Sequence, residues 1–194
     1  VIPEDPTYNG YILKPLCEAL LALAGHPAPR VTVLEKAGTR GYPAACEYIR
    51  AYLQDWPMMD LFLFLPDRDG QSGAPGAGDR IEQIAELEKR AREEGRWLLG
   101  CAAIEEIEVW LMAGHPEKLD ALGLRWSDTR KEAKPSQGSF VRFLESFGDQ
   151  SVGRGRKRLM QEACQLMNGV LARCGELQAL LDRIRSGDGR PPAA

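Results

Sequence analysis

The sequence predicts an α/β protein, a mostly parallel sheet of about four strands flanked by helices, with an all-helical extension at its C-terminal end. Two observations lead to this prediction. Over residues 1–115, short β-branched or apolar runs alternate with stretches whose apolar residues recur at helical spacing. From about residue 116 onward, only the helical spacing remains. We therefore expect an α/β core over 1–115, a helical extension over 116–186 and a disordered tail over 187–194.

The expected strands share short length and apolar or β-branched residues, and they are the entry at 1–2, RVTVLE (30–35), DLFLFLP (60–66) and RWLLGCAA (96–103). The run at 60–66 is apolar almost throughout, which is typical of a strand buried on both faces of a parallel sheet. Helical spacing follows each strand, at 12–24, from Pro43 through 53, at 80–94 and at 104–114. In the extension, a long apolar stripe runs from 159 to 174 and a short helix covers 176–185.

Composition excludes several classes of protein. The 194 residues are 44% hydrophobic and 27% charged, which is ordinary for a folded globular domain and unlike a disordered or collagen-like chain. A chain of this length buries enough surface to need no disulfide or metal for its core. Its longest apolar runs are well short of the roughly 20 residues that span a bilayer, so we expect no contact with a membrane.

Cysteine and histidine usage narrows the chemistry. The five cysteines, at 17, 46, 101, 164 and 174, form no CxxC pair, and reduced thiols of a cytoplasmic protein explain them. Both histidines, His26 and His115, lie in Gly-His-Pro loops. These residues are too few for a zinc site, or for a nucleophile activated by histidine.

The net charge of −3 conceals an asymmetry along the chain. Residues 1–115 carry 11 Lys and Arg against 18 Asp and Glu, whereas residues 116–194 carry 14 against 10. An acidic half can hold cations and a basic half can hold phosphates, and two solvated faces would give the same composition.

Asp67 and Asp69 are the first candidates for chemistry. They follow the buried strand at 60–66, and the C-terminal ends of parallel strands face the ligand crevice of open α/β sheets. Residues two apart in extended backbone point the same way, so both carboxylates can face one Mg²⁺ or Mn²⁺ ion. Asp-Arg-Asp-Gly is also good turn chemistry, and both interpretations stay open on spacing alone.

Other carboxylates are expected at the same edge of the sheet. Glu4 follows the first strand, and Glu105, Glu106 and Glu108 follow the strand at 96–103. On the helix expected there, Glu105 and Glu108 share a face and Glu106 points elsewhere. Acidic residues also favour a helix N-terminus for reasons of its dipole.

Basic residues gather in SVGRGRKRLM (151–160), where Arg154, Arg156, Lys157 and Arg158 precede or begin a helix. Cations at a helix start oppose the dipole, so phosphate binding competes with a plain solvated surface as their explanation. Lys131 and Lys134 lie on a polar segment with an open role. GAPGAGDR (73–80) is not a phosphate-binding loop, because it lacks the Lys and Ser or Thr that must follow the glycines.

Glu4 and the Asp67-Arg68-Asp69 string resemble the two acidic motifs of the Toprim domains of topoisomerases, primases and overcoming-lysogenization-defect nucleases. More closely, the chain resembles a small Toprim-like family of undefined biochemistry, in three segments: PEDPT (3–7), EIEVWL (106–111) and CGELQAL (174–180). Two positions depart from the pattern, with Asp5 in place of a glycine and Tyr8 in place of another acid.

The resemblance implies a Toprim-like fold and a Mg²⁺- or Mn²⁺-dependent nuclease or phosphoryl-transfer domain acting on DNA or RNA. Glu4, Asp67 and Asp69 would be catalytic and metal-binding, with Glu106 or Glu108 completing the ligand set and Arg154–Arg158 binding the backbone. Lys131 or Lys134 would assist the chemistry. The family is often paired with an ATPase and linked to phage defence, and a homo-oligomer is possible. The alternatives are a non-catalytic partner of an ATPase and a nucleotide-binding phosphatase.

Overall fold

The computed structural model describes residues 1–35, 41–68 and 80–192, and over these residues the protein is α/β. Its sheet has the parallel strands β1 (Ile2–Pro3), β2 (Phe62–Leu65) and β3 (Leu98–Gly100) in the order β1-β2-β3. Beyond β2 and β3 the pairing continues through a bridge between Asp67 and Ala103. The bridge extends the ladder toward the carboxyl ends of the strands, where the predicted acidic residues lie.

Strand β2 is buried on both faces, as its apolar run predicts. Leu63 and Leu65 pack into the larger core with the C-terminal helices, while Phe62 and Phe64 pack into a second core on the opposite face. This division follows from the alternation of side chains along a strand. The sheet is therefore the middle of three layers.

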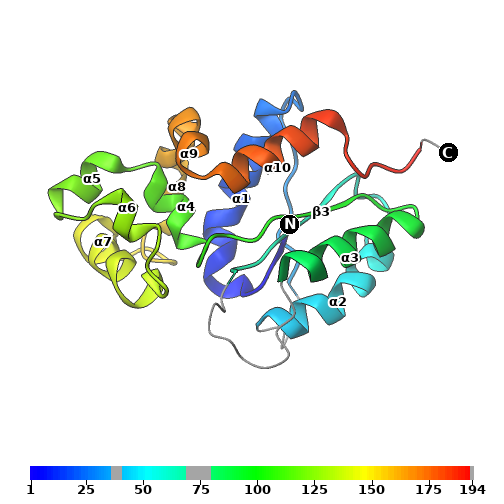
Figure 1. Ribbon diagram of the computed structural model, residues 1–194, viewed down its shortest axis with the longest axis horizontal. Coiled ribbons are helices and arrows are strands. Elements are labelled where there is room, and N and C mark those ends of the chain that lie inside the picture. The colour runs from blue at the N-terminus through cyan, green and yellow to red at the C-terminus, as the bar shows by residue number, and fades with distance from the viewer. Residues whose placement is uncertain (36–40, 69–79, 193–194) are drawn as a thin grey trace.

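Helices cover both faces of the sheet (Figure 1). On one face lie α2 (Tyr42–Asp55) and α3 (Arg80–Glu93), and on the other lie α1 (Pro6–Leu23) and α10 (Gly175–Ser186). The predicted apolar positions of α2 are all buried, namely Ala45, Ile49, Tyr52 and Leu53.

The remaining helices gather in a lobe beside α1, at the end of the molecule away from α2 and α3 (Figure 1). They are α4 (Glu108–Ala113), α5 (Pro116–Ala121), α6 (Trp126–Thr129), the short 3₁₀ helix η1 (Pro135–Gln137), α7 (Ser139–Phe147), α8 (Arg156–Gln165) and α9 (Met167–Arg173). Side chains of α4, α7, α8 and α9 share the larger core with α1 and the sheet. One continuous core therefore runs through both the α/β part and the helices after residue 116.

The prediction of a fourth strand over 30–35 is wrong for the described part of the chain. Among the described residues this segment bonds only to Val1, whose amino group donates to the Thr32 carbonyl (2.7 Å) and whose carbonyl accepts from the Leu34 N–H (2.9 Å). Along a strand Pro3 faces the same side as Val1, and proline has no N–H with which to continue the ladder. The pairing therefore stops after one residue.

Two predicted helices also differ from the structure. The helix expected over 104–114 begins only at Glu108, because Glu105 has a φ of +66°, which no α-helix accommodates. The apolar stripe at 159–174 is split into α8 and α9 at Leu166, whose φ is −111°.

The five cysteines are free thiols. Within residues 1–35, 41–68 and 80–192, no helix is long and apolar enough to cross a membrane. The end of the chain, as far as Pro192, passes close to β3, where the Trp97 indole N–H donates to the Asp188 carbonyl (2.7 Å).

Candidate functional site

The ends of the three strands bring four carboxylates to one edge of the sheet, which we call the acidic edge: Glu4, Asp67, Glu106 and Glu108. Glu4 follows β1, Asp67 follows β2, and the two other glutamates follow β3. Parallel strands all deliver their carboxyl ends to the same side, so this gathering follows from the topology. The side chains interact, because Glu4, Glu106 and Glu108 all raise the pKa of Asp67.

Among the described residues, Glu4 is the member of the acidic edge that forms an ion pair with an arginine. Its Oε2 lies 3.2 Å from Arg80 Nη1 and accepts from the Asp67 N–H (3.2 Å), while Oε1 accepts from the Tyr42 N–H (3.0 Å). Arg80 also donates to the Asp67 carbonyl, and its guanidinium lies 4.3 Å from the centre of the Tyr42 ring. Glu4 therefore ties β1, β2, α2 and α3 together.

Asp67 has no such counter-charge. Its Oδ1 accepts from the Ile107 N–H (2.8 Å), and its Oδ2 has no hydrogen-bond partner among the described residues. Burial raises the pKa of Asp67 to about 8, with further increases from Glu108 and Glu4, and the Ile107 N–H offsets only part of this. The carboxyl group of Asp67 therefore keeps its proton near neutral pH and would lose it on binding a cation.

Glu106 and Glu108 have different surroundings, although both are buried. Both carboxylate oxygens of Glu106 accept from Ser136, one from its N–H (2.6 Å) and one from its hydroxyl (2.9 Å). Glu108 bonds to no other described residue, and burial raises its pKa, with Glu106 adding to the rise and Arg156 opposing it. Asp67 and Glu108 are thus the two carboxylates of the acidic edge in which at least one oxygen accepts no hydrogen bond from another described residue.

The acidic edge as defined above leaves out two predicted acidic residues, for different reasons. Glu105 does not share a helix face with Glu108, contrary to the prediction, because the chain turns at Glu105 before α4 begins. Asp69 lies outside the described residues.

The donors of the acidic edge suit a hard divalent cation, which prefers carboxylate oxygens. In the described part of the chain, no group of three or more His, Cys, Asp or Glu side chains is close enough to hold a metal ion. Mg²⁺ usually keeps several waters and binds one or two protein carboxylates together with substrate phosphates. Asp67 and Glu108 could provide the one or two protein carboxylates that such a Mg²⁺ site uses.

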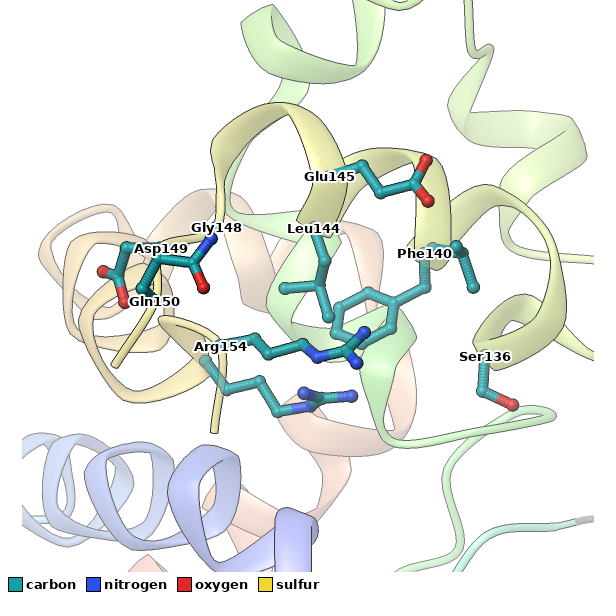
Figure 2. A pocket seen from close by; sticks show the side chains of 10 residues that line it. Ser136, Phe140, Leu144, Glu145, Gly148, Asp149, Gln150 and Arg154 are labelled. Atoms are coloured by element: carbon teal, nitrogen blue, oxygen red, sulfur yellow. The ribbon is translucent and has the colours of Figure 1, made fainter. Parts of the chain in front are cut away.

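The basic segment of the sequence lies across from the acidic edge. A pocket of about 480 Å³ lies between α7 and the chain that precedes α8, and Arg154 and Arg156 line it with Ser136 and Phe140. Figure 2 shows Ser136 on one side of this pocket, Asp149 and Gln150 on the opposite side, and Arg154 between them. We call it the basic pocket. Glu106 bonds to Ser136, so the pocket adjoins the acidic edge.

The other predicted phosphate-binding residues are not part of the pocket. Arg158 is bound by Asp149 (3.2 Å), by Glu162 and by the Phe147 carbonyl (2.8 Å). Lys157 is exposed and lines a separate cleft beside α1 with Lys14 and Glu35. Lys131 and Lys134 are exposed, on the segment between α6 and η1.

Sequence reasoning missed the residues that organise these groups. Arg80 bonds to a carboxylate 76 residues away, and nothing in the local sequence signals that pairing. Ser136 lies 30 residues from Glu106. Tyr8 did give a signal, as a departure from the expected acid, and its ring lies 4.8 Å from the Arg156 guanidinium.

Comparison with protein-family models, with curated proteins and with solved structures finds no match for this chain.

Proposed function

We propose that this protein is a Toprim-like, Mg²⁺- or Mn²⁺-dependent domain that cleaves or transfers phosphoryl groups on nucleic acid. One observation carries the proposal: Asp67 and Glu108 follow the ends of the neighbouring strands β2 and β3, both are buried with a raised pKa, to which Glu108 contributes at Asp67, and neither forms an ion pair with an arginine or lysine among the described residues. Two buried like charges are costly, and a divalent cation stabilises both as anions.

The residues of this chain would divide the work. Asp67 and Glu108 would hold the metal, which supplies Lewis-acid charge at the scissile phosphate and an activated water. Glu4 accepts the Asp67 N–H and fixes the backbone at the end of β2. Arg154 and Arg156 would bind the negative charge of the phosphate from the neighbouring pocket. Asp69, two residues after Asp67 in the sequence, remains a candidate ligand.

The test is cleavage of a plasmid and of a single-stranded oligonucleotide in the presence of Mn²⁺. Asp67→Asn and Glu108→Gln should each lower the cleavage rate by at least about 100-fold, because each removes a charge that holds the metal. Asp60→Asn is the matched control, since Asp60 is exposed and lies just before β2, at the opposite end of the strand. Equal cleavage by Asp67→Asn and wild type would refute the proposal, as would no cleavage with either metal.

A second candidate function is a non-catalytic partner of an ATPase. The Glu4–Arg80 pair favours it, because Arg80 already provides at Glu4 the positive charge that a catalytic metal would bring. The ATPase and a role in phage defence enter both candidates through the family resemblance alone. Two measurements separate the candidates. A partner subunit would bind no Mn²⁺ in calorimetry and would co-purify with the ATPase.

A further inference from the structure

We propose that the basic pocket binds a phosphate monoester, held between the guanidinium groups of Arg154 and Arg156. The inference deepens the proposed function, on which it rests for its link to nucleic acid, because it names the terminal phosphate of a nucleotide as the group recognised.

The size of the pocket is the first argument. Its volume of about 480 Å³ is within the range of small-molecule sites and is large enough for a nucleotide. One wall is α7, with Phe140 and Leu144, while Asp149 and Gln150 lie across the pocket from Ser136 (Figure 2).

Arg156 has unused hydrogen-bonding capacity in a fixed position. Its guanidinium lies between two rings, 4.8 Å from the centre of Tyr8 and 5.1 Å from that of Phe140. Nη1 donates to the Gly153 carbonyl (3.1 Å), but the buried Nε has no partner. A buried N–H without an acceptor among the described residues is costly, so the position of this guanidinium is not explained by internal hydrogen bonds. The planar guanidinium matches the geometry of phosphate.

Arg154 is held beside Arg156 by an unusual turn. Gly153, Arg154 and Gly155 have φ values of +78°, +52° and +78°, so three successive residues are left-handed. Glycine adopts this conformation freely, whereas arginine does so at a cost. Gly153 is also required by space, because a Cβ there would lie 2.7 Å from the Tyr11 ring. Strain of this kind is concentrated at ligand-binding positions.

The two arginines favour a doubly charged ligand. Burial lowers the pKa of Arg156, Glu108 and Tyr8 offset part of this, and the positive charge of Arg154 lowers the pKa further, so the two guanidinium groups repel each other. A phosphate monoester carries up to two negative charges near neutral pH, whereas each backbone phosphodiester carries one. Helix α8 begins at Arg156 without a side-chain cap, so its first N–H groups add to the positive potential.

Two acidic side chains line the pocket, Glu145 and Asp149. Asp149 is occupied by Arg158 and by the Ser151 N–H (2.9 Å). In Figure 2, Leu144 and Phe140 lie between Glu145 and Arg154. Ser136 donates its hydroxyl proton to Glu106, so a phosphate bound here would lie next to the acidic edge.

The test measures binding in EDTA, so that it does not depend on any metal. The full chain is titrated with inorganic phosphate, with AMP, with adenosine, and with one oligonucleotide prepared with and without a 5′ phosphate. AMP and the phosphorylated strand should bind, and adenosine and the unphosphorylated strand should not. Binding of AMP alone would identify a free nucleotide as the source of the monoester, and binding of the phosphorylated strand alone would identify a strand end.

Three variants show whether AMP binding depends on the two arginines of the basic pocket. Arg154→Gly removes the charge and suits the left-handed backbone, and Arg156→Lys keeps the charge but loses the planar group; each should weaken AMP binding by about tenfold or more. Arg142→Ala removes an exposed charge from α7 outside the pocket and should leave binding unchanged. Arg154→Gly keeps the test valid if Arg156→Lys fails to fold.

The proposal is overturned if none of phosphate, AMP and the phosphorylated strand binds at millimolar concentration, if Arg142→Ala weakens binding as much as Arg154→Gly, or if both strands bind and do so with equal affinity. A failure of the proposed function is distinguishable, because loss of Mn²⁺ binding or of cleavage leaves this metal-free result standing.

Discussion

The acidic edge and the basic pocket are built alike, although they carry opposite charge. Each has one ionised side chain that the fold fully pairs: Glu4 with Arg80 at the edge, and Arg158 with Asp149 and Glu162 beside the pocket. Each also has two side chains that form no ion pair among the described residues, Asp67 and Glu108 in one case and Arg154 and Arg156 in the other. The paired residues hold elements together, and the unpaired ones are available to a ligand.

The comparison also explains the net charge of −3. That value is the remainder of an acidic α/β half and a basic helical half. The structure places part of each excess on either side of the Glu106–Ser136 contact. Arrangement, and not composition, makes this chain a candidate for binding a metal and a phosphate together.

The largest effect on stability is expected from removing Arg80, which pairs with Glu4 at the acidic edge. Arg80→Ala leaves Glu4, which is 12% exposed, without its cation, and should lower the free energy of unfolding by about 3 kcal/mol. Urea denaturation measures the change. Arg50→Ala is the control, because Arg50 is 75% exposed and its pair with Glu94 is worth at most about 0.5 kcal/mol. Equal losses in the two variants would mean that Glu4 is not held by Arg80.

A smaller, pH-dependent effect on stability is expected at Asp67 of the acidic edge. The folded state raises the pKa of Asp67 from 3.8 to about 8, since burial, Glu108, Glu4 and Glu106 outweigh the Ile107 N–H. The folded state then binds this proton more tightly than the unfolded chain, so wild-type stability falls as pH rises between these values.

Asp67→Asn has no proton to lose and should avoid this fall, being more stable than wild type by about 2 kcal/mol above pH 8 in the absence of metal. Thermal unfolding at a series of pH values measures the difference. Asp60→Asn should follow the wild-type curve. If Asp67→Asn also follows it, then Asp67 is ionised without cost and the acidic edge is not short of a cation.

The smallest effect is expected at the paired arginine of the basic segment. Arg158 is partly exposed, so Arg158→Ala should cost about 1 kcal/mol of stability. AMP affinity should stay within about twofold of wild type, because Arg158 donates to protein groups and does not line the pocket. A loss of affinity as large as that of Arg154→Gly would mean that binding follows total charge and not position.

Sequence periodicity predicted the parts of this molecule that depend on local pattern. The apolar run at 60–66 predicted a strand buried on both faces, and the burial of Phe62, Leu63, Phe64 and Leu65 confirms it. The missing fourth strand shows the limit of this reasoning, because pairing of 30–35 depends on a proline in another strand. Pairing between distant segments leaves no periodic signal.

The same limit applies to the candidate site. Residues at strand ends could be placed on one edge from topology alone. Their pairing could not, since Arg80 reaches Glu4 and Ser136 reaches Glu106 only through the tertiary fold. A run such as Arg154–Arg158 predicts positive charge, but the turn at 153–155 and the rings of Tyr8 and Phe140 decide which arginines are left for a ligand.

The most direct measurement of the central claim is calorimetric titration with Mn²⁺ at pH 7, repeated in two buffers with different ionisation enthalpies to count the protons released. Metal binding must deprotonate a carboxyl group whose pKa is about 8. The account predicts release of close to one proton per Mn²⁺ from the wild-type protein, and both weaker binding and almost no proton release from Asp67→Asn. No Mn²⁺ binding at millimolar concentration, or binding with the same proton release in Asp67→Asn, would contradict it.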